Sequence, residues 1–447
     1  MAAAAAASSG SEKPLPQTAD EVAAELARAE RELSRPQRLA QKVFECGLDD
    51  SLVTAAEKET LRKEILEEVE DAAIAHLPLV LRPTATLACP RRPPPPPNDP
   101  PATLAAEMST YYQVVCERLG WPVDAALLER MVAKNDAKIK EFDAAITDAR
   151  ENYGDDELYE RVRVKAKYFV QIGDGDRAGK AYAELGEAKV SVGQKVDMQM
   201  EQALLAFLLD DAKEAKRRVE AAKELNDKGG DWDRRNRLKV YEAMSLAWGR
   251  QLAEAAELLL SCVATFTCAE MMSYSGFAWY CIVLSMVGVE RARLAKKVVN
   301  APDLLSVSAQ VPEAFTLVRA LHDCRYADFF RALTAIAPAL SRDRFLGRHV
   351  ALYVKEMRVR AYSQFLEAYR SVTLEGIASA FGVSTSFIDA ELARFIAARR
   401  LNAKINRMTG IVESTRPDSK NAKYESSLRR TDALLARVQR LARSLDV

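Results

Sequence analysis

One stretch near the C-terminus, residues 355–413, constrains the fold most, because it combines a long helix, two short amphipathic helices and a hairpin pattern. Apolar residues recur at helical spacing over 374–381, and Gly382 follows where a left-handed residue ends a helix. A second apolar face runs through 388–396. Residues 401–413 then alternate around a glycine-containing turn, which predicts two short antiparallel strands. Helix, helix, hairpin is the order of a winged helix.

The chain before this stretch, from Met108 onward, reads almost entirely as helices joined by short turns. Three segments carry small or apolar residues three apart and follow one another at spacings of 34 residues (178 to 212) and 40 residues (212 to 252). Helix pairs that pack closely in tetratricopeptide-like arrays need such positions. A chance match among alanine-rich helices is the alternative. The matching residues are Ala178 and Ala181, Ala212 and Ala215, and Leu252 and Ala255.

The predicted fold class is therefore an all-α solenoid of tetratricopeptide-like repeats, followed by a winged-helix module with a small β-hairpin and a C-terminal helix. Four parts are expected. Residues 1–101 are an extension, partly disordered, with helical patterns at 19–33 and 51–77 and a proline run at 89–101 that predicts a polyproline II linker. The solenoid occupies 102–340, the winged-helix region 341–422 and the terminal helix 423–447.

Composition narrows the classes of function. The 64 basic and 64 acidic residues cancel, so no net charge draws the chain to nucleic acid or to an anionic membrane. Seven cysteines without a C-x-x-C pair suit a reducing intracellular compartment. The N-terminus has no secretory signal pattern. The uncharged stretch 271–289 favours a buried solenoid helix over a membrane span, because the flanking chain is helical and densely charged.

The sequence offers no catalytic or metal-binding pattern. The three histidines, His76, His322 and His349, have no further histidine or cysteine at metal-ligand spacing. Residues 322–324 read His-Asp-Cys, but consecutive helical residues point in different directions and cannot form a nucleophile–base pair with one another. Phosphate-loop and hydrolase motifs are missing as well. We expect no enzymatic activity and no cofactor.

The charges on the second short helix decide between nucleic acid and protein as the partner of the wing. Asp389 and Glu391 are expected to face the phosphate backbone if this helix reads DNA, which is repulsive. A hairpin at the end of a sheet instead offers backbone groups that can pair with a neighbouring wing. We therefore expect a protein partner, with Ile405, Ile411 and Val412 around the wing as contacts.

The last helix carries an apolar stripe that needs a cover. From residue 424 onward, apolar positions alternate by three and four, as in a coiled coil or a helical bundle. The stripe either folds back on its own domain or packs with partner helices. The candidate contacts are Leu434, Val438, Leu441 and Leu445.

A distinctive charged motif occupies residues 229–241, which read Gly-Gly-Asp-Trp-Asp-Arg-Arg-Asn-Arg-Leu-Lys-Val-Tyr. Its aspartates offset its arginines, so a charged contact between repeats is favoured over a nucleic-acid or nuclear-import patch. Trp232, Arg234 and Arg235 are its candidate structural residues.

This motif and several others resemble the family of the proteasome 26S non-ATPase regulatory subunit 6, in the same order and over residues 108–447. Helical repeats that end in a winged helix are also the pattern of the PCI domain. Before Met108 the chain departs from the family pattern. The other matching motifs are Glu356-Met-Arg, Ala361-Tyr-Ser-Gln, Phe381-Gly-Val, Phe387-Ile-Asp, Arg394-Phe-Ile-Ala-Ala and Arg416-Pro-Asp-Ser-Lys-Asn.

The resemblance implies a non-catalytic scaffold of the proteasome regulatory-particle lid, in the cytoplasm and nucleus. The implied partners are other PCI-domain lid subunits through the wing, the lid metalloprotease subunits through a helical bundle, and the base ATPases, in a hetero-oligomer without nucleic acid or membrane. The deubiquitinating metalloprotease of the lid carries an H-x-H motif, which this sequence lacks. Two alternatives stay open: the paralogous signalosome subunit and, from a different class, a winged-helix nucleic-acid binder.

Overall fold

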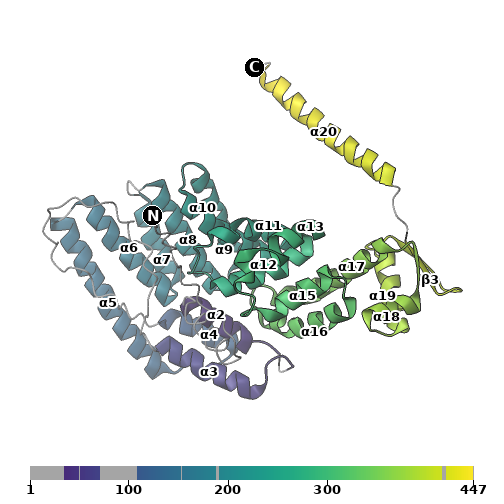
Figure 1. Ribbon diagram of the computed structural model, residues 1–447. Helices are drawn as coiled ribbons and strands as arrows, with labels where there is room; N and C mark the ends of the chain where they lie inside the picture. The colour runs from purple at the N-terminus through teal and green to yellow at the C-terminus, as the bar shows by residue number, and fades with distance from the viewer. Residues whose placement is uncertain are drawn as a thin grey trace, which may run out of the picture. The chain divides into compact units, whose positions relative to one another are not determined.

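The computed structural model describes residues 35–49, 51–70, 108–152, 154–187, 191–414 and 419–445 (Figure 1). The chain divides into two compact units, one within 1–319 and 332–353 and the other within 320–331 and 354–447. The predicted helix at 19–33 and the proline run at 89–101 lie outside the described residues. The four-part division made from the sequence stays a prediction.

The first unit consists of helices joined by short turns, and successive antiparallel pairs lie side by side (Figure 1). Its helices before the repeats are α2 (Arg35–Cys46), α3 (Ala55–Glu70), α4 (Ser109–Leu119) and α5 (Ala125–Asn152). The repeats contain α6 (Asp155–Ile172), α7 (Gly175–Glu187), α8 (Val192–Leu208), α9 (Ala212–Asp227), α10 (Trp232–Trp248) and α11 (Leu252–Cys262). They are followed by η1 (Val263–Thr265), α12 (Tyr274–Gly288), α13 (Arg291–Leu294), η2 (Ala295–Val299), α14 (Pro302–Leu305), α15 (Pro312–His322) and η3 (Gly347–His349).

The predicted repeat positions fall on equivalent helices. α7, α9 and α11 are the second helices of three consecutive pairs, and in each one a small residue of the pattern is fully buried against its neighbours: Ala178, Ala215 and Ala255. Local signals set the helix ends. Ser191 and Gln194 form a capping box at the start of α8, and Asp211 caps α9. The prediction of an all-α repeat fold is thereby confirmed.

The uncharged stretch around residues 271–289 forms α12, a helix buried on all sides. Nine of its residues are buried, including Phe277, Ile282 and Leu284. A helix that is apolar all round suits the interior of a repeat stack as well as it suits a bilayer. Among the described residues, no helix is long and apolar enough to cross a membrane.

The N-terminal helix pair, α2 and α3, packs into the core of the first unit. Leu39, Val43 and Ile65 lie in one apolar cluster with Tyr111 on α4 and Tyr168 on α6. The pair therefore belongs to the folded unit, although the sequence analysis assigned residues 1–101 to an extension.

The same helix pair and the turn between its helices also hold the last residue of α16 (Tyr326–Arg342) and the segment that follows it, residues 343–347. The Nε2 of Gln41 donates to the Arg342 carbonyl at 2.7 Å, and its Oε1 accepts from the Arg344 backbone N–H at 3.2 Å. The Arg342 guanidinium donates in return to the Leu52 carbonyl at 2.8 Å. These hydrogen bonds thus join the N-terminal helix pair to residues 301 and 303 positions later in the first unit.

The second unit is the winged helix that the sequence predicted. Three helices contribute residues to both units: α15, α16 (Tyr326–Arg342) and α17 (Val350–Ala368). The module itself contains α18 (Leu374–Phe381), α19 (Thr385–Ala397), β2 (Ala403–Asn406) and β3 (Ile411–Ser414), and α20 (Ser419–Leu445) follows. Gly382 ends α18 with a φ of 67°, a left-handed conformation that favours glycine.

The sheet contains one strand that the sequence did not predict, β1 (Ser371–Thr373), and its order is β1-β3-β2. β3 pairs antiparallel with both neighbours, with Val412 opposite Val372 on one side and opposite Ile405 on the other. The central strand is thus the last strand of the hairpin, and β1 and β2 form the two edges of the described sheet.

Candidate interaction surfaces

The hydrogen-bond pattern of the β1–β3 ladder shows which way the backbone groups of β3 point. The Ser414 N–H donates to the Arg370 carbonyl at 2.9 Å, and the Leu374 N–H donates to the Gly410 carbonyl at 2.8 Å. Hydrogen-bonded and non-hydrogen-bonded pairs alternate along an antiparallel ladder. Between these two pairs, Val412 therefore directs its N–H and C=O toward β1.

The same alternation assigns the outer edge of β2. Ile411 and Glu413 direct their backbone groups toward β2, where their partners by register are Asn406 and Lys404. Ile405 lies between these two residues, so its N–H and C=O point away from β3. The edge of the sheet thus offers a backbone donor and acceptor at Ile405, one of the residues predicted for the wing contact.

The three predicted wing side chains do not share one environment. Ile405 and Ile411 are half-buried, whereas Val412 is fully buried in the core of the module. The buried side chain of Val412 is not available to a partner in this conformation. The wing contact itself stays a prediction, and it rests on the backbone of β2 and on the side chains of Ile405 and Ile411.

Glu391 corrects one expectation about α19. The sequence predicted that Asp389 and Glu391 both face outward, but Glu391 is only 5% exposed. Its carboxylate accepts from the Tyr362 hydroxyl at 2.6 Å and pairs with the Arg358 Nη1 at 2.6 Å. The reason is helical spacing, because position 391 lies three residues after the buried Ile388 and on the same face. Burial, with the neighbouring carboxylate, raises the pKa of Tyr362.

Asp389 is held by the wing. Its Oδ2 lies 3.3 Å from the Nη2 of Arg407, in the turn between β2 and β3. One acidic residue of α19 thus stabilises the core of the module and the other joins the helix to the hairpin.

α20 presents the predicted apolar stripe to solvent. The predicted contacts Leu434, Val438 and Leu441 are exposed by 59% to 61%, and Leu435 by 56%. The side chain of the fourth predicted contact, Leu445, lies outside the described residues. Four large apolar side chains along 8 residues of one helix form a surface that a partner helix can cover.

The charged motif of residues 229–241 forms the start of α10, and its three candidate residues diverge. Arg234 makes a two-pronged contact with Asp197 on α8, through Nε at 3.0 Å and Nη2 at 2.9 Å. Trp232 is 61% exposed and Arg235 is exposed as well. The motif therefore combines an ion pair between two helices with a solvent-facing tryptophan and arginine.

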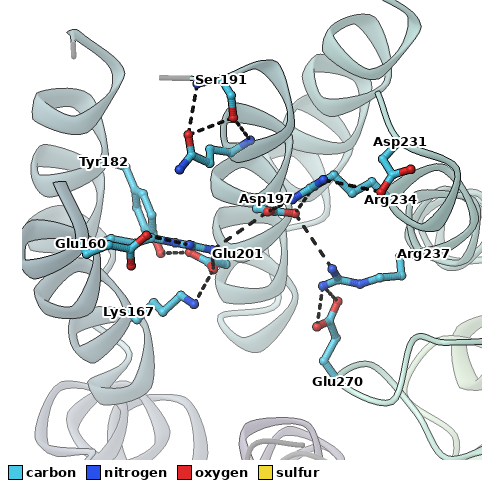
Figure 2. Close-up of polar contacts among 12 residues, drawn as sticks. Glu160, Lys167, Tyr182, Ser191, Asp197, Glu201, Asp231, Arg234, Arg237 and Glu270 are labelled. Atoms are coloured by element: carbon cyan, nitrogen blue, oxygen red, sulfur yellow. Dashed lines mark hydrogen bonds and ion pairs between the residues drawn. The ribbon is translucent and has the colours of Figure 1, made fainter. Parts of the chain in front are cut away.

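Figure 2 shows that this ion pair belongs to a charged network across α6, α8 and α10. Asp197 lies within 4.0 Å of the Arg163 and Arg237 guanidinium groups as well as pairing with Arg234. Arg237 continues the network to Glu270 at 2.6 Å. Favourable charges raise the pKa of Arg237 although its burial lowers it. Each arginine of the network faces at least one carboxylate on a neighbouring helix or loop, so the network joins neighbouring repeats.

A second carboxylate cluster joins distant parts of the first unit around Asp210, a residue that no sequence signal identified. Asp210 adopts a φ of 63° in the turn between α8 and α9. Its Oδ2 accepts from Arg118 on α4 and from Arg348 at 3.1 Å, and its Oδ1 lies 3.9 Å from the Nε of the buried Arg344. The ion pairs of this side chain with arginines from two other segments offset the strain of a non-glycine residue in a left-handed turn.

Asp343 directly precedes Arg344 and lies in the segment held by the N-terminal helix pair. It accepts from the Tyr280 hydroxyl and from the backbone N–H groups of Phe345 (3.1 Å) and Leu346 (2.7 Å). Desolvation outweighs these hydrogen bonds and raises the pKa of Asp343 to about 6.

The described residues contain no group of three or more histidine, cysteine or acidic side chains that can hold a metal ion. His322 contacts the adjacent Asp323 at 3.1 Å, and the Nε2 of His349 lies 3.0 Å from the Trp248 carbonyl oxygen. The first contact joins two adjacent residues, and the second joins two distant segments of the first unit.

Comparison with known proteins identifies two family models along the chain. The model for the 26S proteasome subunit RPN7 matches residues 124–297, and the model for the PCI domain matches residues 330–416. The first match covers the repeats with the charged network, and the second covers the winged helix.

Curated relatives match over most of the chain. The 26S proteasome non-ATPase regulatory subunit 6 of Dictyostelium discoideum is 40% identical over 341 residues, covering 76% of this chain and 89% of the relative. The homologous subunit of Arabidopsis thaliana is also 40% identical, covering 76% and 88%. The 26S proteasome regulatory subunit RPN7 of Saccharomyces cerevisiae is 35% identical over 359 residues, covering 75% and 84%.

Proposed function

The chain belongs to the RPN7 family of 26S proteasome regulatory subunits, and from this premise we propose that it is a non-catalytic scaffold subunit of the regulatory-particle lid. In this role it supports the ATP-dependent degradation of ubiquitinated proteins by holding other subunits in place. The observation that carries the proposal is the exposed apolar stripe of α20, because apolar side chains in this pattern are buried when other helices pack against them.

The wing supplies the second proposed contact. The outward backbone groups of Ile405 can extend the sheet into the wing of a neighbouring PCI subunit, which is β-augmentation at a short edge. The side chains of Ile405 and Ile411 border this edge and contribute apolar contact.

We propose the following partners and location for the chain. The wing contacts other PCI-domain subunits, α20 enters a bundle with helices of the lid metalloprotease subunits, and the repeats lie near the base ATPases. The complex is a hetero-oligomer of the cytoplasm and nucleus. The relatives named non-ATPase regulatory subunits support a role without catalysis.

A truncation tests the scaffold proposal. Removing residues 424–447 is expected to leave the repeats folded, as judged by circular dichroism, but to prevent entry into the lid on a native gel. A point variant gives the same test without truncation: Leu434→Asp with Val438→Asp places two charges in the stripe. The matched control, Arg440→Asp with Arg443→Asp, changes charge on the opposite side of α20 and is expected to assemble. Normal lid from the stripe variant rules out α20 as the assembly contact.

Identification of the co-purifying subunits separates the lid from the paralogous signalosome. Lid subunits recovered with the tagged full-length chain support the proposal. Recovery of signalosome subunits in their place shows that the chain is a subunit of the signalosome and not of the lid.

A further inference from the structure

The starts of α8 and α10 carry exposed apolar side chains that the proposed wing and bundle contacts do not use. Trp232 opens α10 and is 61% exposed; among the described residues of the first unit it is the only largely exposed aromatic side chain. Val192 opens α8 and is 37% exposed. Single exposed aliphatic residues are ordinary on a protein surface, but a tryptophan exposed to this extent is not.

These two residues lie at neighbouring helix starts. A Cβ placed on Gly193 would lie 2.9 Å from the Nη1 of Arg234, so the first turn of α8 contacts the first turn of α10. Figure 2 shows Ser191 and Asp231, the caps that precede Val192 and Trp232, at the same end of the two helices. We call the surface formed by Val192, Trp232 and Arg235 the α8–α10 tip.

The guanidinium that the α8–α10 tip offers to a partner is that of Arg235. Its neighbours on α10 are neutralised within the unit, Arg234 by Asp197 and Arg237 by Glu270. Arg235 is exposed and forms no ion pair with another described residue. It follows Trp232 by three residues, a spacing that places the two side chains side by side on the helix. The tip therefore presents an indole, a guanidinium and a valine to solvent, and the exposed carboxylate of Asp231, 3.9 Å from Nη1 of Arg234, lies at the same helix start.

We propose that the α8–α10 tip docks an acidic segment of another subunit of the regulatory particle. The segment supplies an apolar pocket for the Trp232 indole and a carboxylate for Arg235. Tryptophan and arginine are the residue types that most often dominate the binding energy of protein interfaces. A second copy of this chain is a poor occupant, because a symmetric contact would bring two unpaired Arg235 side chains together.

The inference rests on the proposed function, and oxidative footprinting of Trp232 tests it in the full chain. Hydroxyl radicals oxidise exposed tryptophan, and mass spectrometry reads the modified peptide. We expect at least fivefold less oxidation of Trp232 in the assembled lid than in the isolated chain, with the half-buried Trp279 as internal reference. Equal oxidation in both states overturns the docking proposal while leaving the scaffold role intact. Protection in the isolated chain at high concentration assigns the surface to a second copy and also overturns it.

Binding of variants to a lid that lacks this subunit gives the second readout. Trp232→Ala and Arg235→Glu are each expected to weaken binding by about 30-fold, the effect typical of an interface hot spot. Arg235→Lys keeps the charge and is expected to retain most of the affinity. Val132→Ala removes another exposed apolar side chain, on α5, and serves as the matched control.

Each outcome of the binding measurement is decisive. The variants change exposed side chains, so the melting temperature of the isolated chain is expected to stay unchanged. Wild-type affinity in Trp232→Ala refutes the proposal. Failure of the wild-type chain itself to join the lid refutes the docking surface and the scaffold role together.

Discussion

Replacing Glu391 by alanine tests whether a buried carboxylate stabilises the winged helix. The side chain accepts a hydrogen bond from Tyr362 and pairs with Arg358 inside the module, where Glu391 is 5% exposed. Alanine removes the acceptor and leaves the hydroxyl of Tyr362, a residue only 1% exposed, without this partner. The variant thus combines a lost charged hydrogen bond with a newly unsatisfied buried group.

The expected magnitude follows from the two contacts. A hydrogen bond to a charged group contributes about 1.5–3 kcal/mol to stability. The Arg358 side chain is 29% exposed, so it can regain water, and its pairing contributes less than about 1 kcal/mol. We therefore expect Glu391→Ala to lower the free energy of unfolding of the module by about 2–4 kcal/mol. Glu391→Gln keeps an acceptor for Tyr362 and is expected to lose about half as much.

Hydrogen exchange with mass spectrometry is the appropriate assay, because it reports the opening of α19 within the full chain. Faster exchange of the amides in residues 388–397 gives the change in opening free energy. Asp389→Ala is the matched control, since Asp389 lies on the same helix but pairs with Arg407, whose side chain is 72% exposed. We expect a change below about 0.5 kcal/mol for this control. Equal effects of the two alanine variants refute the assignment of Glu391 as the buried member of the pair.

Three further predictions follow from other contacts. Ile405→Pro removes the outward N–H of β2 without breaking a β2–β3 hydrogen bond, so we expect an unchanged melting temperature but weaker binding to a neighbouring PCI subunit. Ile405→Ala keeps this N–H and should bind that subunit more tightly than Ile405→Pro does. Equal affinities of the two variants exclude the backbone contact. Burial raises the pKa of Asp343 from its ordinary value of 3.8 to about 6 in the folded state. Between these two values the folded state binds more protons than the unfolded state, so stability should fall as pH rises. Asp343→Asn should flatten the dependence of the melting temperature on pH over this range, and an unchanged slope argues against Asp343 as its source. Asp197→Ala deprives three arginines of a shared partner and should lower the free energy of unfolding of the first unit by about 2–3 kcal/mol. Urea unfolding followed by tryptophan emission measures this, because all four tryptophans lie in the first unit. A loss below about 0.5 kcal/mol contradicts a stabilising network.

The winged helix was predictable because its signals are local. Thr373 caps α18 by accepting from the Gly376 N–H at 3.1 Å, and Gly382 ends the same helix in a left-handed conformation. The spacing of apolar residues predicted α18, α19 and the β2–β3 hairpin. The strand β1 was missed because three residues, Ser-Val-Thr, are too short to display an alternating pattern, and its existence depends on pairing with a strand forty residues later.

The candidate surfaces were predictable only in part. An apolar stripe on a terminal helix is visible in the sequence, and the structure leaves Leu434, Val438 and Leu441 exposed. Which face of α19 a carboxylate occupies depends on tertiary packing, so Glu391 was placed on the wrong side. The Asp210 cluster brings together arginines from segments about 90 and 140 residues away, a separation over which local patterns carry no information.

The closure of the first unit by its N-terminal helix pair has a consequence for synthesis. Gln41 bonds to Arg342, a partner 301 residues later in the chain. At the usual pace of translation, about 5–20 residues per second, roughly 15–60 s separate the emergence of the two residues from the ribosome. During that interval the apolar faces of α2 and α3 have only part of their final surroundings. The first unit therefore cannot complete its fold during translation until the segment around Arg342 has emerged, and until then part of the apolar surface of α2 and α3 stays exposed.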